Sequence, residues 1–103
     1  MKTIDINGCT FEVIKPRNEV RPFVGRFCDE SAIFCHYDRP SISKVKIWKS
    51  WLDWAHETDG VVSFEICSSN DYQFTIAGLY IDDNGDEYNI YITKAHNRLY
   101  KVN

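Results

Sequence analysis

The fold of this chain is decided by residues 43–58, which read SKVKIWKSWLDWAHET. At 100° per residue this stretch separates into two halves, as expected for a helix that packs one side on a core. The apolar half holds Val45, Ile47, Trp48, Trp51, Leu52, Trp54 and Ala55, and the polar half holds Lys46, Lys49, Ser50, Asp53, His56 and Glu57. The three tryptophans could line a ligand groove, but a core is the favoured interpretation, because each buries roughly 150–250 Å² on folding.

The ends of this helix carry their own signals. Ser43 is suited to the N-cap position, with Ile42 and Ile47 placed as a hydrophobic staple. Gly60 can adopt the left-handed conformation that stops a helix. Lysines crowd the start and acids crowd the end, which is the unfavourable arrangement for the helix dipole. A tolerated local cost of this kind points towards a function for the charges.

Downstream of the helix, residues 61–102 are expected to form an antiparallel meander. Val62, Phe64 and Ile66 make the apolar alternation of its first strand, and residues 68–71 make a loop. A second hairpin is expected to turn on two residues, Asn84-Gly85. That register pairs Ile81 with Tyr88, Leu79 with Ile90, Ala77 with Ile92, Tyr80 with Asn89, and Gly78 with Tyr91. Residues 95–98 then turn the chain into a last strand, 99–102.

Upstream of the helix, residues 3–14 are expected to form a hairpin with a type I′ turn at Asn7-Gly8. This register places Ile6 opposite Cys9 and Ile4 opposite Phe11. Between the two regions the pattern is weaker: it suggests one helical turn at residues 18–21 and a short strand at residues 32–37.

These elements predict one globular domain, residues 1–103, of the α+β class. An antiparallel sheet of about six strands, made of the N-terminal hairpin and the C-terminal meander, packs against one main amphipathic helix. Exposed strand edges would permit a homodimer.

Composition and the first residues of the chain indicate where in the cell the protein is found. Hydrophobic residues make up 44% of the chain, but no run approaches the roughly 20 apolar residues of a membrane span. The first residues lack the apolar region of a secretory signal, so we expect a cytoplasmic protein with no membrane contact and with reduced cysteines. There is no glycine-rich phosphate loop, and no cofactor is expected.

The charges are segregated along the chain. From Ser50 to Thr93 there is no lysine or arginine, but there are nine acids, whereas residues 1–49 hold nine bases and six acids. The sharpest feature is the predicted hairpin tip at residues 82–87. Like charges facing each other across a hairpin are destabilising, so folding alone did not require four acids there. The alternation of Asp82, Asn84 and Asp86 lacks the glycine and closing glutamate of an EF-hand, so no metal site is expected.

We therefore expect a small non-enzymatic binding or inhibitor protein whose acidic face docks on a basic surface of a partner protein. Proteins that handle nucleic acids are the natural partners, because they keep strongly basic grooves. The residues assigned to this partner-binding site are Asp82, Asp83, Asp86 and Glu87, supported by Asp53 and Glu57. Phage anti-defence proteins such as anti-CRISPR proteins, and immunity proteins that neutralise nuclease toxins, are acidic and compact in the same way, which is an analogy of composition only. Direct nucleic-acid binding is not expected, because the acidic half would repel phosphates.

Two alternatives remain open. The basic start of the main helix could sequester a nucleotide or another phosphorylated anion at Arg39, Lys44, Lys46 and Lys49. A metal-free hydrolase could instead use His96 as a base beside Lys94 and Arg98, as small ribonuclease toxins of this size do in a more basic setting.

The cysteines and the remaining histidines give a weaker signal. Cys28, Cys35, His36 and His56 lack the spacing of a structural zinc site. On a strand, adjacent Cys35 and His36 would point to opposite faces and could not act as nucleophile and base.

Overall fold

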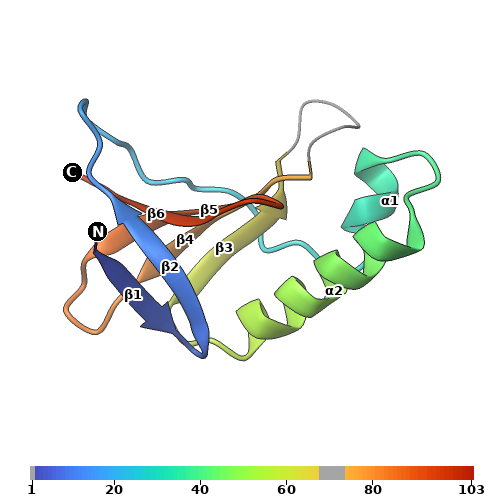
Figure 1. Cartoon of the computed structure of the whole chain (residues 1–103), viewed down its shortest axis with the longest axis horizontal. Helices are drawn as coiled ribbons and strands as arrows, with labels where there is room; N and C mark the ends of the chain where they lie inside the picture. The colour runs from blue at the N-terminus through green and yellow to red at the C-terminus, as the bar shows by residue number, and fades with distance from the viewer. Residues whose placement is uncertain (1, 68–73) are drawn as a thin grey trace.

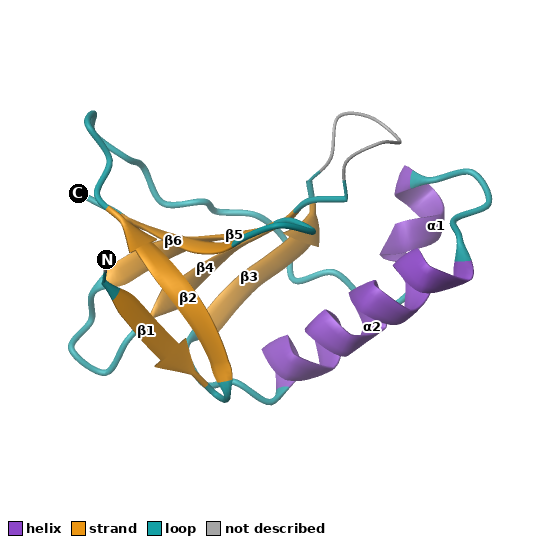
Figure 2. Ribbon diagram, in the orientation of Figure 1, coloured by secondary structure: helices purple, strands orange, loops and turns teal. Residues whose placement is uncertain are grey.

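The computed structural model describes residues 2–67 and 74–103 and has an α+β fold (Figures 1 and 2). In these residues six strands form one sheet in the order β1-β2-β6-β5-β4-β3. The strands are β1 (Thr3–Ile6), β2 (Cys9–Ile14), β3 (Val61–Ile66), β4 (Ile76–Ile81), β5 (Glu87–Ile92) and β6 (Asn97–Lys101), and the helices are α1 (Ala32–His36) and α2 (Ile42–His56). The expected fold class is confirmed, with α2 as the main helix on the sheet. The loop expected at residues 68–71 lies outside the described residues.

The N-terminal hairpin forms as predicted. Asn7 and Gly8 have φ values of 44° and 83°, which is the left-handed pair that a type I′ turn requires. The strands pair in the predicted register, with Ile6 opposite Cys9. Ile6 and Phe11 are buried, so one face of the hairpin joins the core.

The C-terminal meander also forms, but the register predicted for the β4–β5 hairpin is wrong by one residue. Gly78 faces Ile90, and Ala77 faces Tyr91. Tyr91 therefore lies across from Ala77 and does not cover Gly78. A Cβ atom on Gly78 would lie 2.3 Å from the carbonyl oxygen of Ser63, so only glycine fits at this close approach of β3 and β4.

The register differs because the turn has three residues instead of two. Asp82 N donates to the carbonyl of Asp86 (3.0 Å), and Gly85 N donates to the carbonyl of Asp82 (3.0 Å). Gly85 has φ 83°, as in a type I turn followed by a left-handed residue. The carboxylate of Asp82 also accepts from Asn84 N (2.9 Å) and Asp86 N (2.8 Å). This side chain selects the longer turn, which the dipeptide Asn84-Gly85 alone did not reveal.

β3 departs from simple alternation. Its pairing with β4 shifts between Val61 and Ser63, and both of these residues are buried. Val62 is 52% exposed, so its expected place on the apolar face is wrong. The irregularity turns this residue outwards, as an extra residue in a bulge does. Phe64 and Ile66 are buried as predicted.

The pairing that joins the two parts of the sheet was not predicted. β6 pairs antiparallel with β5 and parallel with β2, where Val13 faces Leu99. β6 begins at Asn97, two residues before the expected start. A parallel pair needs a long crossover connection, and here it includes both helices. Leu99 is fully buried in the centre of the sheet.

Residues 15–25 cross the sheet on the face opposite α2 (Figure 1), and residues 26–28 then run beside β3, where Cys28 N donates to the carbonyl of Phe64 (2.9 Å). The side chain of Asn89 on β5 accepts from Phe23 N (2.7 Å), and the hydroxyl of Ser63 on β3 accepts another backbone N–H of this segment (3.1 Å). Apart from Phe27, which forms an isolated parallel bridge with Phe64 on β3, the segment has no regular secondary structure. The helical turn expected at residues 18–21 is wrong. The carbonyls of this stretch bond other parts of the chain: that of Arg21 accepts from Asn89 Nδ2 (2.8 Å) and that of Val20 from Asn103 N (3.2 Å).

Residues 32–37 do not form the expected strand, because Ala32–His36 is the short helix α1. Just before it, the carboxylate of Asp29 accepts from the backbone N–H (3.0 Å) and the hydroxyl (2.6 Å) of Ser31. Ile33 is fully buried and anchors α1 in the core. A six-residue apolar run is too short for its periodicity to distinguish a strand from a helix.

α2 begins slightly earlier than expected, with Ser41 instead of Ser43 as its N-cap. The Ser41 hydroxyl accepts from Lys44 N at 3.2 Å, and its extended backbone (φ −64°, ψ 155°) is what an N-cap requires. Ile42 and Ile47 are 76% and 45% exposed, so the expected hydrophobic staple is wrong. The shift places Ile42 at the first helical position, where it has no partner to staple.

The other end of α2 also differs in detail. The helix ends at His56, and its C-cap Glu57 is right-handed. Gly60 does adopt φ +95°, but it leads the chain into β3 instead of stopping the helix.

The core lies between α2 and the sheet. The largest fully buried side chains are Trp48, Phe11, Phe64, Ile33, Ile66, Ile76, Ile90 and Leu99. Trp48 stacks on Phe64, with ring centroids 5.9 Å apart and planes 9° apart. Trp54 is buried, and its Nε1 donates to the carbonyl of Ile6 (3.1 Å). These two tryptophans confirm the core interpretation. Neither of the two described helices is long and apolar enough to cross a membrane.

Candidate functional site

A cleft lies between the first half of α2 and the turn that joins β5 to β6. Its volume is about 830 Å³, which falls within the roughly 300–1,000 Å³ of small-molecule sites. Its lining comes from α2 and the N-cap before it, from residues 74–76, from the end of β5, and from residues 93–98. These segments are distant in sequence, so the cleft is a product of the tertiary fold.

One wall of the cleft is a stripe on α2. Ser43, Ile47 and Trp51 line it, and a spacing of four residues places them on one side of the helix. Ile47 is 45% exposed, and Trp51 is only half-buried. The expectation that Ile47 belongs to the core is therefore wrong, whereas Trp51 packs against the core and also borders the cleft. The sheet does not follow α2 along its whole length, so these two residues face the cleft.

Trp51 is held firmly in that wall. Its ring meets Trp54 edge-on, with centroids 5.3 Å apart and an angle of 87°. It also packs on Phe11, at 6.1 Å and 57°. Contacts on two sides fix the ring and leave part of it exposed to the cleft.

The opposite wall is the β5–β6 turn. The hydroxyl of Thr93 accepts from Ala95 N (3.2 Å) and His96 N (3.0 Å), and Thr93 N donates to the carbonyl of His96 (2.8 Å). A threonine that bonds the backbone ahead of it in this way fixes a tight turn. Lys94 and His96, both exposed, are thereby held at the rim of the cleft.

The lining of the cleft is cationic. It contains Lys44, Lys94 and Arg98 together with His96, and none of the described residues that line it is acidic. Arg98 has a buried Nε with no hydrogen-bond partner, and it makes no ion pair with any described residue. Ser41 also lines the cleft, so the first turn of α2, with its positive dipole end, borders it. In a protein with a net charge of −3, this lining favours an anion.

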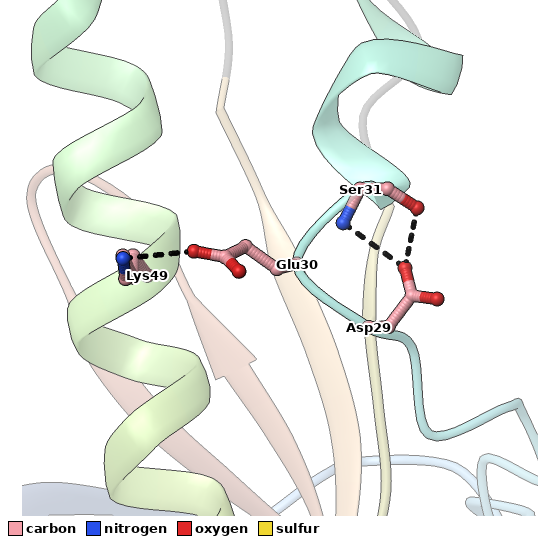
Figure 3. A network of polar contacts seen from close by, with 4 residues as sticks. All are labelled: Asp29, Glu30, Ser31 and Lys49. Carbon is pink, nitrogen blue, oxygen red and sulfur yellow. Dashed lines mark hydrogen bonds and ion pairs between the residues drawn. The ribbon is translucent and has the colours of Figure 1, made fainter.

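The four residues expected to bind an anion at the helix start have different surroundings. Lys44 lines the cleft, and its Nζ lies 4.3 Å from the centre of the Tyr37 ring. Lys49 Nζ pairs with Glu30 at 2.9 Å (Figure 3), and this hydrogen bond raises the pKa of the lysine. Arg39 and Lys46 are exposed, and neither lines the cleft. The structure therefore joins Lys44 to the β5–β6 turn and not to the other three.

Six acids lie at the opposite end of the sheet: the four of the hairpin tip, and Glu57 and Asp59 after α2. β5 runs from the 82–87 hairpin tip to the β5–β6 turn, so the two turns lie far apart (Figure 1). Ile81 N donates to the carbonyl of Gly60 at 2.8 Å, so the hairpin tip adjoins the chain that leaves α2. Glu57 and Asp59 are exposed there. The acids at the end of α2 and those of the hairpin tip thus lie at one end of the sheet, away from the cleft.

The acids of the hairpin tip have unequal roles. Across the hairpin, Asp82 faces Asp86 and Ile81 faces Glu87, so the pairs expected from the two-residue turn, Asp83 with Asp86 and Asp82 with Glu87, do not form. Asp83 is exposed, whereas Asp82, Asp86 and Glu87 are half-buried. The Asp82 carboxylate is occupied by two backbone N–H groups.

Tyr80 lies next to this tip, and the pKa of its phenol responds to the negative charges there. Burial raises the pKa of the Tyr80 phenol, and the negative charges of Asp82 and Asp83 raise it further. Asp53 lies on the exposed side of α2, one turn before Glu57.

A smaller pocket of about 290 Å³ contains Cys28, Cys35 and His36 in its lining. The expectation that Cys35 and His36 point to opposite faces is wrong, because they lie on a helix. Burial, and then a nearby glutamate, raises the pKa of the Cys28 thiol, which is the opposite of what activates a nucleophile. His56 is not in this lining, but its ring contacts Phe27, which is, with ring centroids 4.7 Å apart and planes tilted by 35°. Across the described residues, no three His, Cys, Asp or Glu side chains are placed to hold a metal ion.

Comparisons with models of protein families, with curated proteins and with solved structures found no match. The site is therefore interpreted from its own chemistry. The sequence had pointed to Lys44 and to the Lys94, His96 and Arg98 group as two unrelated features. It contained no signal that Trp51 would stand between them, because its helical position is equally suited to the core.

Proposed function

We propose that this protein binds a small anionic ligand in the cleft between α2 and the β5–β6 turn. The observation that carries the proposal is the lining, which joins Lys44, Lys94, Arg98 and His96 with no acid among the described lining residues. Positive side chains that line one cleft raise the local concentration of anions there. This is the anion-binding alternative from the sequence, with the site moved from the helix start to the cleft.

Binding is a better description of this site than catalysis. A general base is recognised by a group that orients it and by a nucleophile within hydrogen-bond reach. Among the described residues the His96 ring makes no hydrogen bond. The Thr93 hydroxyl accepts two backbone N–H groups of the turn instead. The described residues of the cleft supply positive charge, but none of them orients His96 towards a nucleophile.

Thermal denaturation with and without added anions tests the proposal. A ligand at 100 times its Kd stabilises the folded protein by about 2.7 kcal/mol. For a chain of this size that raises Tm by about 10–20 °C. Pyrophosphate and ribose 5-phosphate are suitable probes, with potassium chloride at matched ionic strength as the control.

Two lysine variants locate the effect. Lys94→Gln should weaken the shift, because Lys94 lines the cleft. Lys46→Gln makes the same charge change on an exposed residue outside it, and it should leave the shift intact. If neither probe raises Tm above the chloride control, the proposal is wrong. If Lys46→Gln abolishes the shift and Lys94→Gln does not, the anion binds at the helix start.

We also propose a second function for the opposite end, where the acids could dock on a basic, nucleic-acid-handling protein. The observation that favours it is the contact between Ile81 and Gly60, which brings the exposed acids at the end of α2 next to the hairpin tip. Carboxylates in such a group attract a basic surface quickly and in a salt-dependent way. Asp82 is not expected to take part, because its carboxylate holds the turn.

Affinity capture with a charge-reversed variant tests this second function. A double variant, Glu57→Lys with Asp83→Lys, changes two exposed acids and should lose a basic partner that the unmodified protein retains at low salt and releases at high salt. Glu19→Lys with Asp38→Lys reverses two exposed acids elsewhere and should retain that partner. Equal capture by both double variants would exclude the acidic end as the docking surface.

A further inference from the structure

We infer that two copies of this chain pair through the outer edge of β1 and join their sheets in a weak antiparallel dimer. β1 is the edge strand on one side of the sheet (Figure 1). None of its four residues lines the cleft, so this surface is separate from the proposed ligand site. An edge strand presents backbone N–H and C=O groups that another strand can use.

The two edges of the sheet differ in how far the chain covers them. The outer edge of β3 is covered, because Phe64 N donates to the carbonyl of Arg26 (3.0 Å) and Cys28 N donates to the carbonyl of Phe64 (2.9 Å). Among the described residues, β1 pairs with β2 alone. The fold therefore leaves one of its two edges open to a partner strand.

The hairpin register fixes which backbone groups of β1 point outwards. Val13 N donates to the carbonyl of Lys2 (2.9 Å), so Lys2 bonds towards β2. In an antiparallel pair this direction alternates from one residue to the next. Ile4 therefore bonds towards β2, whereas Thr3 and Asp5 direct their backbone N–H and C=O groups to the outside. No hydrogen bond joins these outward groups to another described residue.

Two copies of β1 are complementary in one antiparallel register. With Ile4 opposite Ile4 of the second copy, Thr3 of each copy lies opposite Asp5 of the other, and their outward N–H and C=O groups meet. Ile4 then takes the kind of position at which facing side chains lie closest, and it is only partly buried in the monomer. A register centred on Asp5 would place two aspartates opposite each other, which is destabilising. A register centred on Thr3 would leave Asp5 without a partner inside β1.

The charge on β1 fits this register. Asp5 is the only charged residue of the strand, and its carboxylate accepts from the Thr10 hydroxyl (2.6 Å) across the hairpin. The side chains of Thr3 and Asp5 lie on the same face of the sheet, because they are two residues apart on a strand. In the dimer, the Thr3 hydroxyl of the second copy can therefore donate to the same carboxylate. A charge that otherwise protects an edge thus gains a second donor.

The short contact makes the dimer weak. A pair of four-residue strands belongs with the small interfaces below roughly 1,200 Å², which are typical of weak and transient association. We expect a Kd between about 10 µM and 1 mM. The dimer should therefore form and dissociate over a concentration range that is accessible in solution.

Sedimentation velocity over that concentration range, at physiological ionic strength, tests the inference. The unmodified protein should change from monomer to dimer as its concentration rises. Thr3→Asp places like charges opposite each other at both ends of the pair, so it should raise the Kd by about 2- to 30-fold. Thr3→Lys places a lysine opposite Asp5 instead and should lower the Kd by a similar factor.

Ser50→Asp and Ser50→Lys are the matched controls. Ser50 is exposed on α2, and the two variants make the same changes of net charge away from β1. Their Kd values should differ from each other by much less than those of the two Thr3 variants. If the Thr3 variants differ no more than the Ser50 variants do, the dimer does not use this register and the inference is overturned.

Thr3→Pro tests the backbone pairing directly. It removes an outward N–H that no other described residue accepts, and proline is tolerated on an edge strand when its nitrogen faces solvent. The variant should stay folded by tryptophan fluorescence and should remain monomeric. If it does not fold, the comparison of Thr3→Asp with Thr3→Lys still decides. An unmodified protein that stays monomeric up to about 1 mM overturns the inference and leaves the edge of β1 to a strand of another protein.

Discussion

Replacing Asp82 by alanine should destabilise the protein, even though Asp82 belongs to an acidic cluster whose charges repel each other. Its carboxylate accepts from Asn84 N at 2.9 Å and from Asp86 N at 2.8 Å. A side chain that satisfies backbone N–H groups in this way, as an N-cap does, contributes about 0.5–2 kcal/mol. We expect Asp82→Ala to lower the free energy of unfolding by about 1–2 kcal/mol, since two such bonds are lost.

The matched control is Asp83→Ala. Asp83 is exposed, and no hydrogen bond or ion pair joins it to another described residue. Its removal relieves a similar amount of like-charge repulsion, so the difference between the two variants isolates the turn bonds. Asp83→Ala should change stability by no more than about 0.5 kcal/mol. Asp82→Asn keeps an acceptor oxygen without the charge, and it should fall between the other two variants.

Urea unfolding followed by tryptophan fluorescence is the assay, because Trp48 and Trp54 are buried in the native state. The midpoints convert to free energies if the slope is the same in all variants. The reasoning is refuted if Asp82→Ala is as stable as Asp83→Ala. In that case the Asp82 carboxylate does not stabilise the turn, and Asp82 is again a candidate for binding a partner protein.

Three further predictions follow from single contacts. Gly60→Ala should lower the free energy of unfolding by about 2 kcal/mol or more, because Gly60 has φ +95° and its Cβ would lie 2.3 Å from the Ile81 carbonyl oxygen. Gly8→Ala is the control: Gly8 has φ +83° but no atom within 4 Å of its Cβ position, so the variant should lose only the roughly 1–2 kcal/mol of a left-handed backbone in the same denaturant assay. Asp83→Asn should lower the pKa of Tyr80, measured by ultraviolet titration of the phenol, while burial, the larger cause, keeps it above the ordinary value of 10.0; an unchanged titration would contradict the proposed field of the acidic tip. Hydrogen bonds from Ser31 lower the pKa of Asp29 below its ordinary value of 3.8. The stability that the ionised Asp29 contributes is therefore complete above pH 3.8 and is lost as the pH falls through the lower pKa of the folded state. Asp29→Asn should make the urea midpoint less dependent on pH between about pH 5 and 2.

The two hairpins explain why local sequence was sufficient in one case and not in the other. Asn7-Gly8 makes its two-residue turn, and the nearby carboxylate of Asp5 accepts from the Thr10 hydroxyl (2.6 Å) across the hairpin. Asn84-Gly85 has the same dipeptide, but the carboxylate of Asp82 bonds two backbone N–H groups and draws a third residue into the turn. One added residue then shifts every facing pair of β4 and β5.

The candidate site was only partly predictable. The basic start of α2 and the group around His96 both stood out in the sequence, but as separate hypotheses. They share a cleft because β6 pairs with both β5 and β2, which places the β5–β6 turn over the open half of α2. The sequence could not predict that pairing, since a parallel neighbour is chosen by contacts across a long crossover and not by local pattern.

The sequence by itself determined the element types of its strongly patterned parts, the N-terminal turn, the α+β class and the separation of acids from bases. Each of these depends on periodicity, on turn chemistry or on charge order, which act over a few residues. Only the tertiary structure decided that residues 15–25 cross the second face of the sheet, that residues 32–36 are helical, and that Trp51 borders a cleft while Trp48 and Trp54 are buried. The physical reason is that a side chain is buried only when another part of the chain covers it. The same apolar residue is therefore part of the core where it is covered and part of a cleft wall where it is not.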